Sequence, residues 1–222
     1  MIRGAIFDMD GVLLDSMPVW DTIGEQYLRM QGKKPRPGLQ EILFTKSMME
    51  AAAYIREEYQ VDKTEHQILE EIIQLIYGWY KDTIPLKRGV RIFLQYLKDR
   101  NIPMTIATSS DKKLAVAGLT SNGILEFFEN IITCREVGVG KESPLVYEEA
   151  SRYMGTCKQE TWVFEDSLHG IRTAKKAGFF TVGVYDKASQ KMQQKIQKEA
   201  SFYLESFEQM QVLVKYWEGE KR

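Results

Sequence analysis

The chain has 222 residues, 44% of them hydrophobic, and a formal net charge of −1 at pH 7. This balance gives no electrostatic footprint for nucleic acid or an anionic membrane, and no apolar run reaches the roughly 18 residues of a membrane span. Two cysteines, Cys134 and Cys157, and two histidines show no spacing typical of a zinc site. Because the N-terminus carries no signal-peptide pattern, we expect reduced cysteines and a cytoplasmic location.

The first predicted element is a buried strand that ends in acids. It runs from about Arg3 to Phe7, and the segment Asp8-Met9-Asp10-Gly11 follows it directly. A helical block with little strand signal then extends from about Met17 to Tyr80. Its first helix is predicted from Pro18 to near Gln31, because proline is favoured in a first turn and Gly32 follows as a stop.

Two capping boxes mark later helix starts in this block. Ser47-Met48-Met49-Glu50 precedes three alanines, and Thr64-Glu65-His66-Gln67 precedes an apolar stripe. The second of these helices is expected to carry Ile68, Leu69, Ile72, Ile73 and Ile76 on its apolar side.

From about Asp82 the pattern changes to helices that alternate with short strands. The predicted strands are Met104–Ala107, Ile131–Thr133, Trp162–Phe164 and Thr181–Val184. The predicted helices are Gly89–Arg100, Asp111–Ser121, Pro144–Met154, Leu168–Ala177 and a last one capped by Ser206. Repeated βα units predict an α/β fold with a doubly wound parallel sheet and helices on both faces.

Right-handed crossovers bring the ends of such strands together at one edge of the sheet. The helical block is then an insertion after the first strand, and we expect it to sit over that edge. The chain is therefore divided into an α/β core domain, residues 1–15 and 82–222, and an inserted all-helical cap domain, residues 16–81.

Two carboxylates after the first strand are the first candidates for chemistry. Asp8 and Asp10 are either turn-forming acids that accept backbone hydrogen bonds or a catalytic pair. As a pair, Asp8 attacks phosphorus and forms an aspartyl-phosphate, and Asp10 protonates the leaving group and later activates water. That division of roles requires different environments for the two carboxyl groups.

Two further strand ends carry groups suited to an anion. Thr108 and Ser109 precede a predicted helix, where hydroxyl and N–H groups either cap the helix or bind phosphate. Ser110 is expected to be an N-cap. Lys141 follows a loop with two glycines, and its ammonium either faces solvent or neutralises phosphate together with Asp8.

A second pair of acids follows the strand predicted at Trp162–Phe164. Glu165 and Asp166, with Ser167, are either a helix cap favoured by the helix dipole or part of a metal site. Two more acids beside Asp8 repel strongly without a cation, and carboxylate oxygens with phosphate and water suit Mg²⁺.

Taken in order, these motifs resemble those of the haloacid dehalogenase-like superfamily, in its phosphatase branch. The motifs are Asp8-Met9-Asp10-Gly11, Thr108, Lys141 and Glu165-Asp166, and the resemblance covers nearly the whole chain. The stretch from Glu165 to Ile171 is similar to the acidic motif of the β-phosphoglucomutase-like subgroup.

The resemblance implies a Rossmann-like core and a Mg²⁺ site. The metal is expected to be held by Asp8, the backbone carbonyl of Asp10 and Asp166. Glu165 is expected to support the metal from outside this set of direct ligands, or through a water molecule.

The resemblance also implies that Thr108, the Ser109 backbone and Lys141 hold the phosphoryl group. The helical insertion is expected to be a mobile cap that excludes water when it closes. Mutase members carry a histidine in the first cap helix, where this chain has Trp20, and dehalogenase members lack the second aspartate, here Asp10.

The expected function is a Mg²⁺-dependent phosphatase for a small phosphorylated metabolite, with a sugar or polyol phosphate expected by analogy. One alternative is a β-phosphoglucomutase-type isomerase, which returns the phosphoryl group to a sugar. A second alternative is a non-catalytic binding protein on the same fold. No nucleic-acid or membrane partner is expected, and we expect a monomer.

Overall fold

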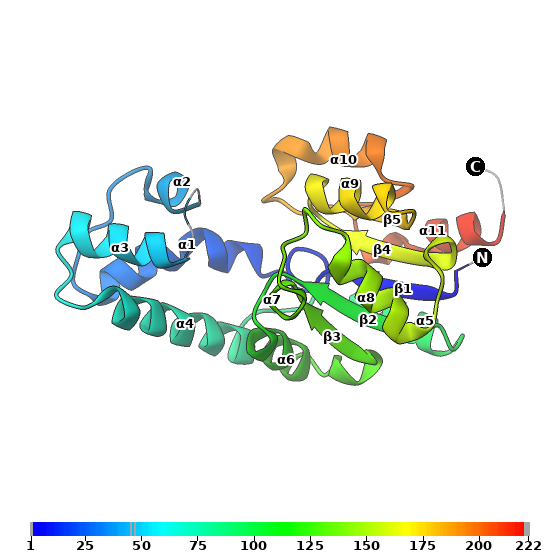
Figure 1. Cartoon of the computed structure of the whole chain (residues 1–222), viewed down its shortest axis with the longest axis horizontal. Helices are drawn as coiled ribbons and strands as arrows, with labels where there is room; N and C mark the ends of the chain where they lie inside the picture. Colours follow the sequence, from blue (N-terminus) through cyan, green and yellow to red (C-terminus); the bar gives the residue numbers. More distant parts are fainter. Residues whose placement is uncertain (1, 45, 47, 220–222) are drawn as a thin grey trace. The chain divides into compact units, whose positions relative to one another are not determined.

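The computed structural model describes residues 2–44, 46 and 48–219. The chain divides into two compact units, one of Met1–Ser16 with Ile84–Arg222 and one of Met17–Thr83 (Figure 1). The first unit is an α/β structure, and the second is helical.

The α/β unit is built on a six-stranded sheet with the order β3-β2-β1-β4-β5-β6, in which every neighbouring pair is parallel. The strands are β1 (Gly4–Phe7), β2 (Met104–Thr108), β3 (Asn130–Thr133), β4 (Thr161–Glu165), β5 (Phe180–Val184) and β6 (Phe202–Leu204). This order confirms the predicted doubly wound, Rossmann-like sheet. The strand order reverses at β1, and open α/β sheets bind ligands at the carboxyl ends of the strands at such a switch point.

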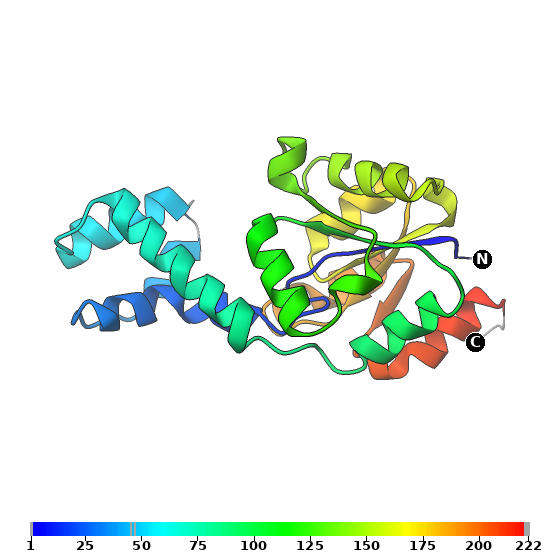
Figure 2. The same ribbon diagram turned by 90° about the horizontal axis from the view of Figure 1, so that it is seen from below.

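Helices cover both faces of this sheet. They are α5 (Val90–Lys98), α6 (Lys112–Ser121), α7 (Cys134–Val137), α8 (Leu145–Met154), α9 (Leu168–Lys176), α10 (Gln193–Glu199) and α11 (Met210–Trp217). In the view of Figure 2, α5 and α11 lie together on one side of the sheet and α8 lies on the other.

Successive strand residues point to opposite faces, and this alternation builds the core on both sides of the sheet. On one face, Ile6 belongs to a buried cluster with Tyr147 of α8. On the other face, Phe7 and Phe164 stack with their ring centroids 4.5 Å apart, and Phe93 of α5 packs edge-on against both rings. Because both faces are apolar, polar groups are left to the strand ends.

The helical unit contains α1 (Met17–Met30), α2 (Leu39–Phe44), α3 (Met48–Tyr59) and α4 (Glu65–Asp82). The capping box predicted for α4 is confirmed. The Thr64 side chain accepts from the Gln67 N–H, and the Gln67 side chain accepts from the Thr64 N–H at 2.9 Å. The capping box predicted at Ser47 lies outside the described residues.

The apolar side of α4 is narrower than predicted. Ile68, Ile72 and Ile76 are buried, but Ile73 is 41% exposed, so the buried side of the helix does not include it. Each helical residue is rotated by about 100° from the one before, which turns Ile73 away from the row that Ile72 shares. Among helices of the described chain, none combines the length and apolar character needed to cross a bilayer.

Candidate active site

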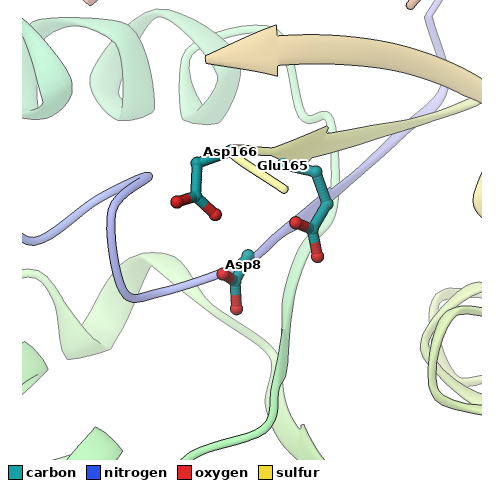
Figure 3. Close-up of side chains that lie close together, drawn as sticks. All are labelled: Asp8, Glu165 and Asp166. Atoms are coloured by element: carbon teal, nitrogen blue, oxygen red, sulfur yellow. The ribbon is translucent and has the colours of Figure 1, made fainter. Parts of the chain in front are cut away.

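Asp8 lies directly after β1 and is tied by its backbone to β4. The Asp8 N–H donates to the carbonyl oxygen of Phe164 at 2.9 Å. Parallel pairing of β1 with β4 therefore brings Asp8 beside the acids that end β4. Figure 3 shows the carboxylates of Asp8, Glu165 and Asp166 side by side, and one oxygen from each lies within 4.8 Å of the others. The structure thus brings three of the predicted site residues together.

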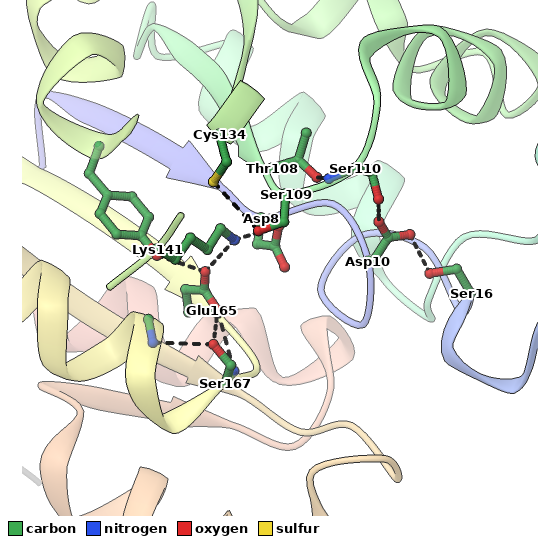
Figure 4. A network of polar contacts seen from close by, with 12 residues as sticks. Asp8, Asp10, Ser16, Thr108, Ser109, Ser110, Cys134, Lys141, Glu165 and Ser167 are labelled. Carbon is green, nitrogen blue, oxygen red and sulfur yellow. Dashed lines mark hydrogen bonds and ion pairs between the residues drawn. The ribbon is translucent and has the colours of Figure 1, made fainter. Parts of the chain in front are cut away.

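Lys141 reaches into this acidic cluster from the loop before α8. Its side chain is buried, with Nζ 2.7 Å from Oδ1 of Asp8 and in contact with Oε1 of Glu165 (Figure 4). The ammonium therefore bridges two carboxylates at the ends of neighbouring strands, one directly after β1 and one at the end of β4. The alternative of a solvent-facing lysine is wrong.

Glu165 is completely buried, and both of its oxygens accept hydrogen bonds from the protein. Oε1 accepts from the Tyr147 hydroxyl at 2.8 Å as well as from Lys141. Oε2 accepts from the hydroxyl of Ser167 at 2.8 Å and from its N–H at 3.3 Å. Ser167 also caps α9, since its hydroxyl accepts from the N–H of Gly170. Glu165 therefore orients Lys141 and links it to the start of α9.

Asp10 is held apart from this cluster by two hydroxyl groups. Ser16 donates to Oδ1 and Ser110 donates to Oδ2, each at 2.6 Å (Figure 4). The two aspartates of the first motif thus have different surroundings, since Asp8 contacts an ammonium and Asp10 contacts hydroxyls. A difference of this kind is what separate nucleophilic and acid–base roles require.

The segment after β2 carries the predicted phosphate-binding hydroxyls. Thr108 is buried, and its Oγ1 accepts from the N–H of Ser110 at 3.0 Å. Ser109 lies with its Oγ 3.5 Å from Sγ of Cys134. The expectation that Ser110 caps the next helix is wrong: Asp111 is the N-cap of α6, because its carboxylate accepts from Lys113 N–H at 2.9 Å. This leaves the Ser110 hydroxyl free to bind Asp10.

Burial and neighbouring charges divide the protonation states in the cluster. Burial raises the pKa of Asp8 to about 7, although the Lys141 ammonium opposes this. Burial, followed by the charges of Glu165 and Asp8, also raises the pKa of Asp166. For Glu165, burial acts in the same direction, but the Lys141 ammonium and the hydrogen bonds from Lys141, Ser167 and Tyr147 together outweigh it, and the pKa is lowered. Glu165 is therefore the carboxyl group that stays ionised, whereas Asp8 and Asp166 retain protons more readily unless a cation lies beside them.

A divalent cation fits this donor set. The three carboxylates are buried and close together, and hard oxygen donors of this kind suit Mg²⁺. Among the described residues, no hydrogen bond or ion pair compensates the Asp166 carboxylate. A buried, uncompensated carboxylate beside two others is costly without a cation.

Sequence reasoning assigned no role to Ser16 or Tyr147, and it gave Ser110 the wrong one. Ser16 follows the first motif closely, but nothing local shows that its hydroxyl turns back to Asp10. Tyr147 has the spacing of a buried residue on α8, a signal that a phenylalanine would give equally well. These contacts became visible only in the folded chain.

The sheet order and the buried acidic site at the strand ends define a Rossmann-like α/β enzyme. The chain belongs to the haloacid dehalogenase-like hydrolase family, whose model matches residues 5–184. The family predicted from the four motifs is confirmed, and with it the assignment of the chain as an enzyme.

Individual relatives agree with this assignment, and a solved structure agrees with the fold. A phosphorylated carbohydrates phosphatase from Thermotoga maritima is 24% identical over 177 residues, which cover 80% of this chain and 82% of that protein. Hexitol phosphatase B from Escherichia coli is 25% identical over 178 residues, or 79% of this chain and 80% of that protein. The crystal structure of a candidate β-phosphoglucomutase from T. maritima has a TM-score of 0.83 at 23% identity, and the match covers 96% of this chain and 99% of that chain.

Proposed function

We propose that this hydrolase is a Mg²⁺-dependent phosphatase that acts on a small phosphorylated metabolite through an aspartyl-phosphate on Asp8. The observation that carries the proposal is the position of Asp8. Its carboxylate lies at a strand end, contacts the Lys141 ammonium and adjoins two further acids. A carboxylate next to fixed positive charge is suited to attack an anionic phosphoryl group.

Asp8 and Asp166 would hold the metal together with the backbone carbonyl of Asp10, and Glu165 would support them from behind. When bound, Mg²⁺ neutralises charge on the phosphoryl oxygens and lowers the repulsion between the phosphate and the Asp8 carboxylate. Its positive charge would also favour the ionised form of Asp8, whose pKa is otherwise about 7.

The side chains of the protein carry out both chemical steps. Lys141, the Thr108 hydroxyl and the Ser109 N–H orient the phosphoryl group. An oxygen of Asp8 bonds to phosphorus while the bond to the leaving oxygen breaks, and Asp10 gives that oxygen a proton. In the second step water attacks phosphorus, Asp10 takes the proton of the water, and the bond from phosphorus to Asp8 breaks.

A sugar or polyol phosphate is the proposed substrate class. The named relatives act on phosphorylated carbohydrates and hexitol phosphates, and the chain matches most of the length of each. Hydrolysis is preferred to the mutase reaction because position 20, where the mutases carry a histidine, is a tryptophan. Its Nε1 donates to the Tyr80 hydroxyl at 3.0 Å within the helical unit. The helical unit is proposed to act as the cap that selects the substrate.

The first test is phosphate release from a panel of sugar, polyol and nucleotide monophosphates, with and without Mg²⁺. We expect metal-dependent release from one or a few sugar or polyol phosphates. Asp8→Asn should fold and lose activity by at least about 1,000-fold, because removal of a covalent nucleophile abolishes both steps. Activity that survives in metal-loaded Asp8→Asn would contradict the mechanism, and transfer to a sugar bisphosphate without net release would favour the mutase.

Two further expectations belong to the same proposal. We propose a monomeric enzyme of the cytoplasm that works without a nucleic-acid or membrane partner. Light scattering on the purified protein tests the oligomeric state, and fractionation of the source cells tests the location.

A further inference from the structure

Lys87 is a second lysine whose ammonium group lies inside the α/β unit. Its side chain is only 16% exposed, and its Nζ has three oxygen neighbours. These are the Gly11 carbonyl oxygen at 2.6 Å, the Tyr185 carbonyl oxygen, and Oδ2 of Asp186 at 3.0 Å. An ammonium has three donors, so each has a partner, and the position of Nζ is well defined.

The backbone of Lys87 is attached to the same part of the chain as its side chain. The Lys87 N–H donates to the Leu13 carbonyl oxygen at 2.9 Å, and the Asp15 N–H donates to the Pro85 carbonyl oxygen at 3.0 Å. Lys87 therefore contacts the segment after Asp10 at two points, through its backbone at Leu13 and through its ammonium at Gly11.

Gly11 is the residue at which this segment turns beside the acidic cluster. It has a φ of +74°, and a β-carbon at this position would lie 2.5 Å from Oδ2 of Asp166 and 3.4 Å from Cγ of Asp186. The Gly11 turn thus lies close to two buried carboxyl groups, and it directly follows Asp10. A small rotation at Gly11 would move the Asp10 carbonyl group and the contact with Asp166.

The pairing of the buried charges supports a role for Lys87 at the same place. The buried charged side chains in the described chain are Asp8, Lys141, Glu165, Asp166 and Asp186. Lys141 pairs with Asp8 and Glu165, and Lys87 pairs with Asp186. Asp166 is then the carboxylate without a cation, which matches its proposed place at the metal.

We propose that Lys87 is a positioning residue for the metal site, and that it acts by holding the Gly11 turn between Asp166 and Asp186. The role rests on the proposed function, since it concerns the same acidic cluster. Lys87 lies outside the four motifs, so this role adds a contact that the motifs do not include.

The test replaces both charged residues of the ion pair by neutral ones, Lys87→Met with Asp186→Asn. The Gly11 carbonyl oxygen then loses the ammonium as its donor, while the net charge of the protein is kept. In the full chain we expect at least about tenfold weaker Mg²⁺ binding in calorimetry without substrate, as for other residues that orient metal ligands. We also expect a similar loss of kcat with the substrate KM within about threefold.

A matched control replaces an ion pair of the same unit that lies away from the site, Lys158 with Glu148. Lys158→Met with Glu148→Gln should leave Mg²⁺ affinity and kcat unchanged. If the Lys87→Met pair does not fold, Lys87→Gln with Asp186→Asn retains an amide N–H group as donor. This variant is expected to bind Mg²⁺ with an affinity between that of the first variant and that of the natural protein.

A lower melting temperature with unchanged Mg²⁺ affinity and unchanged kcat would overturn the proposal, because a purely structural contact gives that result. Calorimetry also separates this idea from the proposed function. If no phosphomonoester is hydrolysed by the natural protein, the phosphatase proposal fails, and the Mg²⁺ titration still decides the role of Lys87.

Discussion

At the scale of single residues, the site is made of charged side chains that are buried and paired. Lys141 lies between Asp8 and Glu165, and Tyr147 and Ser167 complete the hydrogen bonds of Glu165. Breaking one partnership in such a network leaves another buried group unpaired, and that costs more than the contact itself contributes. Replacing the residues that support Lys141, which are Glu165, Tyr147 and Ser167, should therefore lower activity.

Tyr147→Phe tests this network by removing one hydroxyl. Oε1 of Glu165 then keeps only Lys141 as a partner. We expect the free energy of unfolding to fall by about 1–3 kcal/mol, because a buried, charged acceptor loses one of its hydrogen bonds. We also expect kcat to fall several-fold, because Lys141 loses part of the support that orients it. Chemical denaturation and steady-state kinetics measure the two effects.

Tyr153→Phe is the matched control for that variant. Tyr153 lies on the same helix, α8, and is 53% exposed, so the loss of its hydroxyl should change neither stability nor kcat measurably. Equal behaviour of the two variants would show that the contact between Tyr147 and Glu165 has no role in the site.

At the scale of elements, the turn after β1 requires a glycine at position 11, because the backbone there is left-handed. Gly11 combines a φ of +74° with a close approach to Asp166. We expect Gly11→Ala to lose about 1 kcal/mol from backbone strain and, in addition, to weaken Mg²⁺ binding because the new methyl group meets the Asp166 carboxylate.

Gly138→Ala separates these two contributions. Gly138 ends α7 with a φ of +77°, and a β-carbon there would meet nothing within 4 Å. It should show the loss in thermal stability without any change in Mg²⁺ affinity. If Gly11→Ala binds Mg²⁺ as well as Gly138→Ala does, the close approach to Asp166 has no consequence for the metal.

Elements with a strong local signal were predicted, and those without one were not. Strands β1, β2, β4 and β5 are short apolar runs, and α4 begins with a capping box. In contrast, α10 buries only Ile196 and β6 spans three residues, so neither produces a readable period. Helix α7 is the exception: it was not predicted, although Thr133 and Glu136 form a capping box that the sequence displays.

At the scale of the whole molecule, removal of the metal should make stability depend on pH. The pKa of Asp8 rises from 3.8 to about 7 in the folded protein. Between these values the folded chain binds more protons than the unfolded chain, so the free energy of unfolding falls as pH rises. The lowered pKa of Glu165 has the opposite effect, but mainly below its ordinary value of 4.5.

The melting temperature of the protein in EDTA should therefore decrease from about pH 5 to about pH 7.5. Excess Mg²⁺ should reduce or reverse this decrease, because the ion binds the deprotonated carboxylates. In Asp8→Asn the slope in EDTA should be smaller. A melting temperature that rises with pH in EDTA would contradict the raised pKa of Asp8.

The sequence by itself determined the class of fold and the residues at the strand ends. Apolar periodicity, glycine stops and acids after short strands are local patterns, because each depends on neighbours within a few residues. They were sufficient to predict the parallel sheet and to select Asp8, Lys141, Glu165 and Asp166, which the structure brings together.

Only the tertiary structure decided which partners hold these residues in place. The Ser110 hydroxyl binds Asp10 and not the N–H of a helix. Tyr147 binds Glu165, and Lys87 binds the Gly11 carbonyl oxygen across 76 positions of the chain. Such contacts depend on strand register and on the packing of helices against the sheet. No pattern within either segment encodes them, since a lysine or tyrosine with the same neighbours can equally face solvent or an apolar core.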